Sequence, residues 1–308
     1  MHVRDPDRSP DAAAPNRKTA HARDFDHSAS RLLTGDRPPG PLPLGHVRSS
    51  LRNRVALQHD GDPFVSNADT LALTDNADDP GRITRHVFDL ALDYLVVGTD
   101  PRLTTICVQS ALPALCELTQ PFLNLVTVAR FERNPTIKEE IQARGFGRDI
   151  PAGFLCYPVA QAAHIAAFRA MLVPVGADHA PMIEQDDEIV RRLDRQVGQA
   201  LLPEARALIP ESRRLPGVGG RAEMRTSQGD ALALSATEDE IRAAVHRMDT
   251  NPDHPRITDL CAFDADRDTV AALKSHDRRG CLSDTVVEQR VETVLLDLVA
   301  PTGARRAA

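Results

Sequence analysis

The stretch that decides the fold lies near the start of the chain and reads Leu33-Thr34-Gly35-Asp36-Arg37-Pro38-Pro39-Gly40-Pro41-Leu42-Pro43-Leu44-Gly45-His46. The short run Arg31-Leu32-Leu33 leads into it and predicts a strand. Its glycines fall in the loop that follows, and a helix is expected over residues 46–58. In a parallel sheet, such a strand-to-helix loop lets a phosphate approach the helix N-terminus. Because loops rich in glycine and proline are common, this signal needs support from the rest of the chain.

Apolar segments of strand length and of helix length alternate along the following part of the chain. Strands are expected at residues 64–66, 106–108 and 172–175. Helices are expected at residues 83–97, 112–126 and 152–170, and Gly98 should end the first of them. This alternation predicts an α/β fold with a Rossmann-like, doubly wound parallel sheet.

Composition divides the chain into four parts. Residues 1–30 are rich in Asp, Arg, Pro, Ala and Ser and predict a disordered tail, whereas residues 31–200 form the expected Rossmann-like, catalytic-type domain. Residues 201–235, rich in Pro, Gly and Arg, are expected to be a mobile loop. Residues 236–308 are expected to be a helical C-terminal module that is truncated at its end. Thr237 and Glu240 have capping-box spacing at its start.

Bulk composition excludes several classes of protein. The chain has 308 residues and a formal charge of −7, which argues against a general basic binder of nucleic acid and against a DNA-binding role. Its five cysteines show no metal-finger spacing, so no metal site is expected. The absence of an apolar run of about 20 residues argues against a membrane span. With no hydrophobic stretch at the N-terminus, these features predict a cytoplasmic protein.

A second segment reads Ala222-Glu223-Met224-Arg225-Thr226-Ser227-Gln228-Gly229. Together with residues 33–46, it resembles the HIGH and KMSKS signatures of class I aminoacyl-tRNA synthetases, in the tryptophanyl version. We call residues 33–46 the first signature and residues 222–229 the second signature. The resemblance extends from about residue 31 to about residue 299. It implies activation of tryptophan with ATP, transfer of the amino acid to tRNA and a C-terminal module that reads the anticodon.

The resemblance also implies roles for residues of the nucleotide site. Magnesium-bound ATP would be a substrate rather than a permanent cofactor. The residues implied in ATP binding are Thr34, Gly35, Gly45, His46, Asp178 and Met224, and those implied in catalysis are His46, Arg225 and Ser227.

Three further segments carry the resemblance to the amino-acid site: residues 68–74, 152–164 and 173–179. The residues implied in amino-acid binding are Asp69, Tyr157, Gln161, His164 and His179. Tyr157 falls where the family contacts the substrate α-amino group. His164 stands where the family has an aspartate that accepts the indole N–H. Gln161 and His164 are three residues apart on one helical face and can point into one pocket.

Several positions depart from the family pattern. Pro43 replaces the first histidine of the first signature, and Glu223 and Thr226 replace lysines that neutralise the pyrophosphate leaving group in the family. Ala177 likewise replaces a glutamate. Losing one preorganised transition-state contact costs roughly 3 kcal/mol, so these changes predict weak or lost synthetase activity.

Three interpretations follow from the sequence. The chain is a divergent tryptophanyl-tRNA synthetase, an inactive pseudo-synthetase that acts as a regulator or partner subunit, or a repurposed amino-acid adenylating enzyme of altered specificity. Arg213-Arg214 and Arg305-Arg306 are short basic pairs of the kind that contact a phosphate backbone. The family pattern implies a homodimer with much of its interface in residues 112–145.

Overall fold

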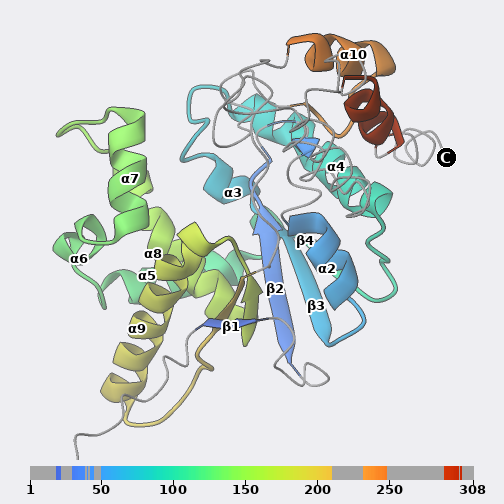
Figure 1. The fold of residues 1–308 in the computed structure, drawn as a ribbon. Helices are drawn as coiled ribbons and strands as arrows, with labels where there is room; N and C mark the ends of the chain where they lie inside the picture. Colours follow the sequence, from blue (N-terminus) through green and yellow to red (C-terminus); the bar gives the residue numbers. More distant parts are fainter. Residues whose placement is uncertain are drawn as a thin grey trace, which may run out of the picture.

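The computed structural model describes residues 19–21, 30–38, 40, 42–44, 50–209, 232–247, 288–297 and 299. At its centre is a six-stranded sheet in the order β1-β6-β5-β2-β3-β4 (Figure 1). Its strands are β1 (Thr19–His21), β2 (Arg31–Asp36), β3 (Asp62–Asn67), β4 (Thr105–Val108), β5 (Leu172–Pro174) and β6 (Arg206–Ile209). Every neighbouring pair is parallel, which confirms the predicted α/β fold.

The order of the strands places a topological switch point between β2 and β5. From β2 the chain continues through β3 to β4 on one side, whereas β5 and β6 lie on the other side. β2 pairs with β3 along its whole length, but it pairs with β5 only at Leu32 and Leu172. In open α/β sheets, ligands bind outside the carboxyl ends of the strands at such a point.

Helices connect the strands and cover both faces of the sheet. They are α2 (Arg52–Leu57), α3 (Asp69–Ala72), α4 (Pro80–Val97), α5 (Pro113–Leu123), α6 (Val128–Glu132), α7 (Pro135–Arg144), α8 (Ala152–Ala167), α9 (Ala180–Val197) and α10 (Glu238–Arg247), with 3₁₀ helices η2 (Gln109–Ala111) and η3 (Ala177–His179). Figure 1 shows α5 to α9 gathered at one side of the sheet and α2, α4 and α10 at the other.

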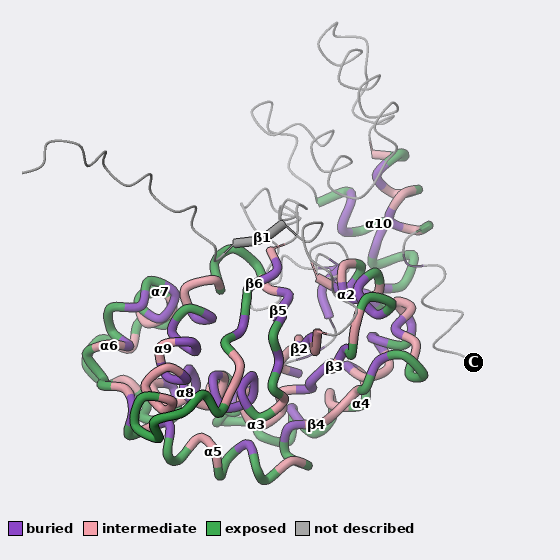
Figure 2. The backbone as a smooth tube through the Cα atoms, turned by 90° about the horizontal axis from the view of Figure 1, so that it is seen from below, coloured by how far each residue is buried: buried purple, intermediate pink, exposed green. Residues whose placement is uncertain are grey.

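Alternation along the strands decides which helix covers each face. Leu33 of β2 and Val173 of β5 belong to a buried cluster with Ile165 of α8 and Ile183 of α9. The adjacent positions, among them Leu32, point the other way and pack against Leu57 of α2. Period-two alternation therefore gives the sheet two apolar faces, each packed against helices. Figure 2 colours the buried residues of the strands purple.

The predicted strands and helices correspond closely to those observed. The strands at 64–66, 106–108 and 172–175 match β3, β4 and β5, and the three predicted helices match α4, α5 and α8. Gly98 ends α4 in the left-handed conformation, with φ of 115°. Of the helix predicted over residues 46–58, the structure describes α2 at 52–57.

Two strands lie in segments that the composition predicts to be a tail and a loop. The expected disordered tail contains β1, and the expected loop from residue 201 contains β6, which pairs with both β1 and β5. Within the same expected loop, Leu232 and Leu234 are buried. These short apolar runs become strands or core because tertiary pairing overrides a local composition rich in proline and arginine.

The C-terminal segments pack beside the first signature. In the predicted capping box, the backbone N–H of Thr237 donates to Glu240 at 2.8 Å and the N–H of Glu240 donates to the Thr237 hydroxyl at 3.3 Å. Ile241 of α10, together with Val291 and Leu295 of the helix at 288–297, joins a cluster that includes Leu42 and Leu44. None of the described helices is long and apolar enough to span a membrane.

Candidate active site

The predicted ligand-binding residues gather at the carboxyl edge of the sheet. Thr34 and Gly35 lie in the second half of β2, Asp69 begins α3 directly after β3, and Asp178 lies in η3 after β5. Because parallel strands end at the same edge, the fold brings these segments together at the switch point. The placement fits the predicted roles, which remain predictions.

Gly35 is required by the sheet itself. It lies opposite Ser66 of β3, and a Cβ atom at Gly35 would lie 2.3 Å from the Ser66 carbonyl oxygen. No side chain fits at that distance, so β2 and β3 can approach each other only because residue 35 is glycine.

A buried ion pair holds the start of the first signature. The Arg54 guanidinium of α2 donates to both Asp36 carboxylate oxygens, and the Tyr94 hydroxyl of α4 donates to Asp36 Oδ2 at 2.9 Å. Burial and the Asp36 charge raise the pKa of Tyr94 well above its ordinary value, so it stays a neutral donor. These contacts join β2, α2 and α4 where the chain leaves the sheet.

Backbone contacts fix the next part of the first signature. The N–H of Leu42 donates to the buried Asp93 carboxylate of α4 at 3.2 Å. Leu44 N–H donates to the Leu232 carbonyl at 2.7 Å, and Leu234 N–H donates to the Leu42 carbonyl at 2.8 Å. These two bonds form an antiparallel bridge between Pro43 and Ala233. The first signature is thus tied to a segment that follows the second signature closely in sequence.

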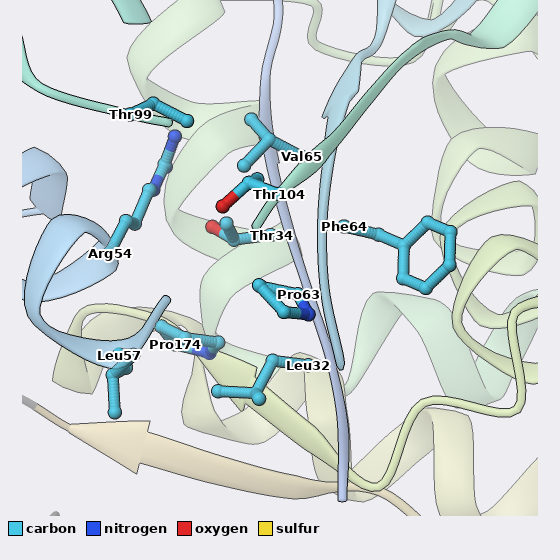
Figure 3. A pocket seen from close by; sticks show the side chains of 10 residues that line it. All are labelled: Leu32, Thr34, Arg54, Leu57, Pro63, Phe64, Val65, Thr99, Thr104 and Pro174. Atoms are coloured by element: carbon cyan, nitrogen blue, oxygen red, sulfur yellow. The ribbon is translucent and has the colours of Figure 1, made fainter. Parts of the chain in front are cut away.

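A small cavity lies between α2 and the β2–β3 face of the sheet (Figure 3). In Figure 3, Arg54 reaches toward it from α2, with Thr34 and Thr104 at its far side. The Arg54 Nε and Thr104 Oγ1 atoms are buried and have no hydrogen-bond partner among the described residues. The cavity has a mainly apolar lining that includes these two unpartnered polar atoms, and it lies under α2, on the opposite face of the sheet from α8.

Tyr157 of α8 is buried among charged side chains. Its hydroxyl donates to the Glu140 carboxylate of α7 at 2.9 Å, and the Arg37 guanidinium lies over its ring, 4.7 Å from the centroid. Arg37 also donates to Asp75 at 2.7 Å. Burial and the charge of Glu140 raise the pKa of Tyr157, so the phenol keeps its proton at neutral pH. The predicted α-amino contact therefore lies between a cation and an anion.

Asp69 and His164 both contact the η2 segment. Asp69 Oδ1 accepts from the backbone N–H of Ser110 at 2.9 Å. The side chain of Gln109 accepts from the N–H of Leu71 at 3.1 Å, and its Nε2 lies 2.7 Å from Nε2 of His164. Hydrogen bonds through η2 therefore join α3 and α8, two of the elements that carry the predicted amino-acid site.

The remaining predicted residues make few contacts in the described part of the chain or lie outside it. Gln161 is half-buried and its side chain makes no hydrogen bond to a described residue. His179 is 47% exposed, and its Nε2 lies 3.7 Å from Asp178 Oδ2. Gly45, His46, Met224, Arg225 and Ser227, with the substituted positions Glu223 and Thr226, lie outside the described residues. Across the described part of the chain, no group of His, Cys, Asp or Glu side chains could hold a metal ion.

Sequence reasoning did not assign roles to four residues that shape this region: Arg37, Arg54, Gln109 and Glu140. Gln109 directly follows the predicted strand at 106–108, so its place at the carboxyl edge was available from the sequence. Arg37 directly follows the observed β2, which extends three residues beyond the predicted strand at 31–33. Arg54 and Glu140 lie on helices and carry no such signal.

Comparisons with known proteins agree on one relationship. Residues 26–292 match the family described as class I tRNA synthetases (W and Y). The chain is 46% identical over 291 residues to the tryptophan–tRNA ligase of Clostridium longisporum, covering 89% of this chain and 85% of that protein. It is 43% identical over 294 residues to a tryptophan–tRNA ligase of Streptococcus agalactiae, covering 89% and 86%.

Solved structures show the same fold. A tryptophanyl-tRNA synthetase from Campylobacter jejuni, complexed with ADP and tryptophan, is similar with a TM-score of 0.78 and 21% identity, covering 90% of this chain and 88% of that one. The synthetase from Mycoplasma pneumoniae is similar with a TM-score of 0.76 and 18% identity, covering 91% and 88%.

Proposed function

Because this chain belongs to the family of class I tRNA synthetases for tryptophan and tyrosine, we propose that it activates tryptophan, or an amino acid closely similar to it, and transfers it to tRNA. In the first step the amino-acid carboxylate attacks the α-phosphate of ATP, giving the aminoacyl-adenylate and releasing pyrophosphate. In the second step the adenylate acylates tRNA and releases AMP. The observation that carries this proposal is the identity of 43–46% with two tryptophan–tRNA ligases over 89% of the chain.

The carboxyl edge of the sheet supports a site for magnesium-bound ATP. We place the nucleotide against Thr34, Gly35 and Asp178, where the strands β2 and β5 diverge. The proposed roles of Gly45, His46, Met224, Arg225 and Ser227 rest on the resemblance of the two signatures alone. The bridge at Pro43 and Ala233 supports this arrangement, since it anchors the first signature beside the chain that follows the second.

The amino acid is placed against α8. The α-ammonium group would lie near the Tyr157 hydroxyl, where the Glu140 carboxylate 2.9 Å away adds an attractive charge. Arg37, on the other side of the Tyr157 ring, offers guanidinium N–H groups beyond those that contact Asp75 and Thr74. The side chain would then extend along α8 toward Gln161 and His164.

Several partners belong to the same proposal. Transfer requires tRNA, and the family pattern implies a homodimer through residues 112–145 and a cytoplasmic site of action. The pseudo-synthetase is a second candidate because Pro43, Glu223 and Thr226 remove groups that the resemblance assigns to catalysis.

The test is ATP–pyrophosphate exchange by the purified chain, with each of the twenty standard amino acids. The proposal expects exchange that depends on tryptophan. Tyr157→Phe should raise the KM for the amino acid several-fold and leave the KM for ATP near its parent value. The control is Phe88→Ala, because Phe88 is 82% exposed on α4 and should change neither constant.

Absence of exchange with all twenty standard amino acids and with close analogues of tryptophan would overturn the synthetase proposal. In that case Glu223→Lys combined with Thr226→Lys separates the two candidates. Rescue of exchange would mean that the rest of the site is intact, whereas continued inactivity would favour the pseudo-synthetase.

A further inference from the structure

Three hydrogen-bonding groups in a row determine which ring nitrogen of His164 carries the proton. The first is the backbone N–H of Leu71, which can only donate, and its acceptor is Gln109 Oε1 at 3.1 Å. This bond fixes the orientation of the Gln109 amide, so the atom that faces His164 is the NH₂ group. Gln109 Nε2 and His164 Nε2 are 2.7 Å apart, within hydrogen-bond distance.

The amide nitrogen of Gln109 can donate but cannot accept. Nε2 of His164 must therefore be the acceptor and carries no proton, which excludes the imidazolium and one of the two neutral tautomers. The remaining form is the neutral ring protonated at Nδ1. Burial favours the same form, because the side chain is only 6% exposed and its pKa is lowered to about 4.

The Nδ1–H group has no acceptor among the described residues. His164 lies on α8, seven residues after Tyr157 and three after Gln161, so the three side chains share one face of the helix. Opposite them, Asp69 and Leu71 of α3 are joined to η2. His164 therefore contributes a donor without a partner among the described residues to the segment where the amino-acid side chain is placed.

We propose that the Nδ1–H group of His164 donates a hydrogen bond into this pocket. The pocket therefore favours tryptophan-like amino acids whose ring carries a hydrogen-bond acceptor, and it binds tryptophan itself less tightly. The indole of tryptophan has an N–H donor and no acceptor. Two donors that face each other leave both unsatisfied, and a site with buried polar groups discriminates strongly against a ligand that cannot pair with them. This inference rests on the proposed function, whose amino-acid site it refines.

The first experiment measures binding, which does not depend on catalysis. Calorimetry compares tryptophan with benzofuranylalanine, an analogue of nearly the same shape in which a ring oxygen with lone pairs and no proton replaces the indole N–H. The parent chain is expected to bind benzofuranylalanine at least about tenfold more tightly than tryptophan. Tighter binding of tryptophan would overturn the inference, and binding of neither would overturn both the inference and the amino-acid site.

Variants can change whether the pocket donates or accepts a hydrogen bond. His164→Asp supplies an acceptor and is expected to reverse the preference in favour of tryptophan. Gln109→Met keeps the side-chain length but removes the donor to His164, so the ring can take either tautomer and the preference should shrink toward equality. His86→Gln, which alters a histidine on α4 that contacts Asp89, is the matched control and should preserve the parent preference.

Two further measurements separate the possible failures. Nitrogen NMR of the histidine rings, with the His164 signal assigned by its loss in His164→Asp, should show a protonated Nδ1 and an unprotonated Nε2. The opposite pattern would overturn the inference. Pyrophosphate exchange tests the proposed function independently: tryptophan-dependent exchange with a preference for tryptophan would refute only the inference. A preference for the analogue without any exchange would refute only the synthetase reaction.

Discussion

The guanidinium of Arg54 and the carboxylate of Asp36 form a two-pronged ion pair, with Nη1–Oδ2 at 2.5 Å and Nη2–Oδ1 at 3.0 Å. The two side chains are only 7% and 10% exposed. Arg54→Met would leave the Asp36 charge buried without its main partner. We expect this variant to lower the free energy of unfolding by about 3–5 kcal/mol, as measured by urea denaturation.

An exposed pair provides the matched control for this prediction. Arg85 lies 3.1 Å from Asp79, and these side chains are 64% and 53% exposed. Because solvent screens such a pair, Arg85→Met should change stability by less than about 1 kcal/mol. Equal losses in the two variants would show that burial does not determine the strength of the Arg54 contact.

The contact between Gly35 and Ser66 predicts a large effect of a single methyl group. Gly35→Ala would force β2 and β3 apart, and we expect a loss of about 1–3 kcal/mol of stability together with weaker ATP binding. Gly153→Ala is the control, since a Cβ at Gly153 meets nothing within 4 Å and the residue lies in α8. That change should leave stability unaltered or raise it by up to about 1 kcal/mol. Similar unfolding midpoints for both variants would contradict the prediction.

Asp186 of α9 makes the stability of the protein depend on pH. The side chain is 2% exposed, and neither of its oxygens has a hydrogen-bond partner among the described residues. Burial, and then the charge of Asp187, raise its pKa well above the ordinary value. The folded state therefore keeps a proton that the unfolded state has lost, and this contribution to stability falls as pH rises above the unfolded pKa.

Asp186→Asn removes that titration. The variant should gain stability relative to the parent as pH rises, by up to about 1.4 kcal/mol per pH unit. Urea denaturation of both proteins across the mildly acidic to mildly alkaline range checks the slope. A constant difference in stability over that range would show that Asp186 ionises equally in the folded and unfolded states.

His164 affects the stability of the protein at acidic pH, and its effect on stability has the opposite pH dependence to that of Asp186. Its pKa is lowered from 6.5 to about 4 by burial, so the unfolded chain takes up a proton that the folded chain refuses. Stability should therefore fall as pH decreases from 6.5 to about 4, by up to roughly 3 kcal/mol from this group. His164→Gln, which does not titrate, should lose less stability than the parent over the same range. Parallel curves would argue against a neutral buried ring.

Sequence reasoning predicted most of the sheet, because β3, β4 and β5 are apolar runs bounded by turns and their pattern is local. It missed β6, since Arg206 to Ile209 lies in a stretch rich in proline and arginine and gains its strand conformation from pairing with β5 and β1. Positions such as Tyr157 and Asp69 came from a resemblance. The Gln109–His164 pair depends on how two side chains approach across the fold, which no single-sequence pattern encodes.

The cluster that joins Leu42 and Leu44 to Ile241, Val291 and Leu295 also affects the order in which the protein can mature. Leu42 emerges from the ribosome long before Leu295. Non-local contacts of this kind form late, because both partners must first be present. The loop proposed to hold ATP therefore gains its final packing only after the helix at 288–297 has been translated. A nascent chain that stops before this helix carries the early residues of the site without the support that shapes them.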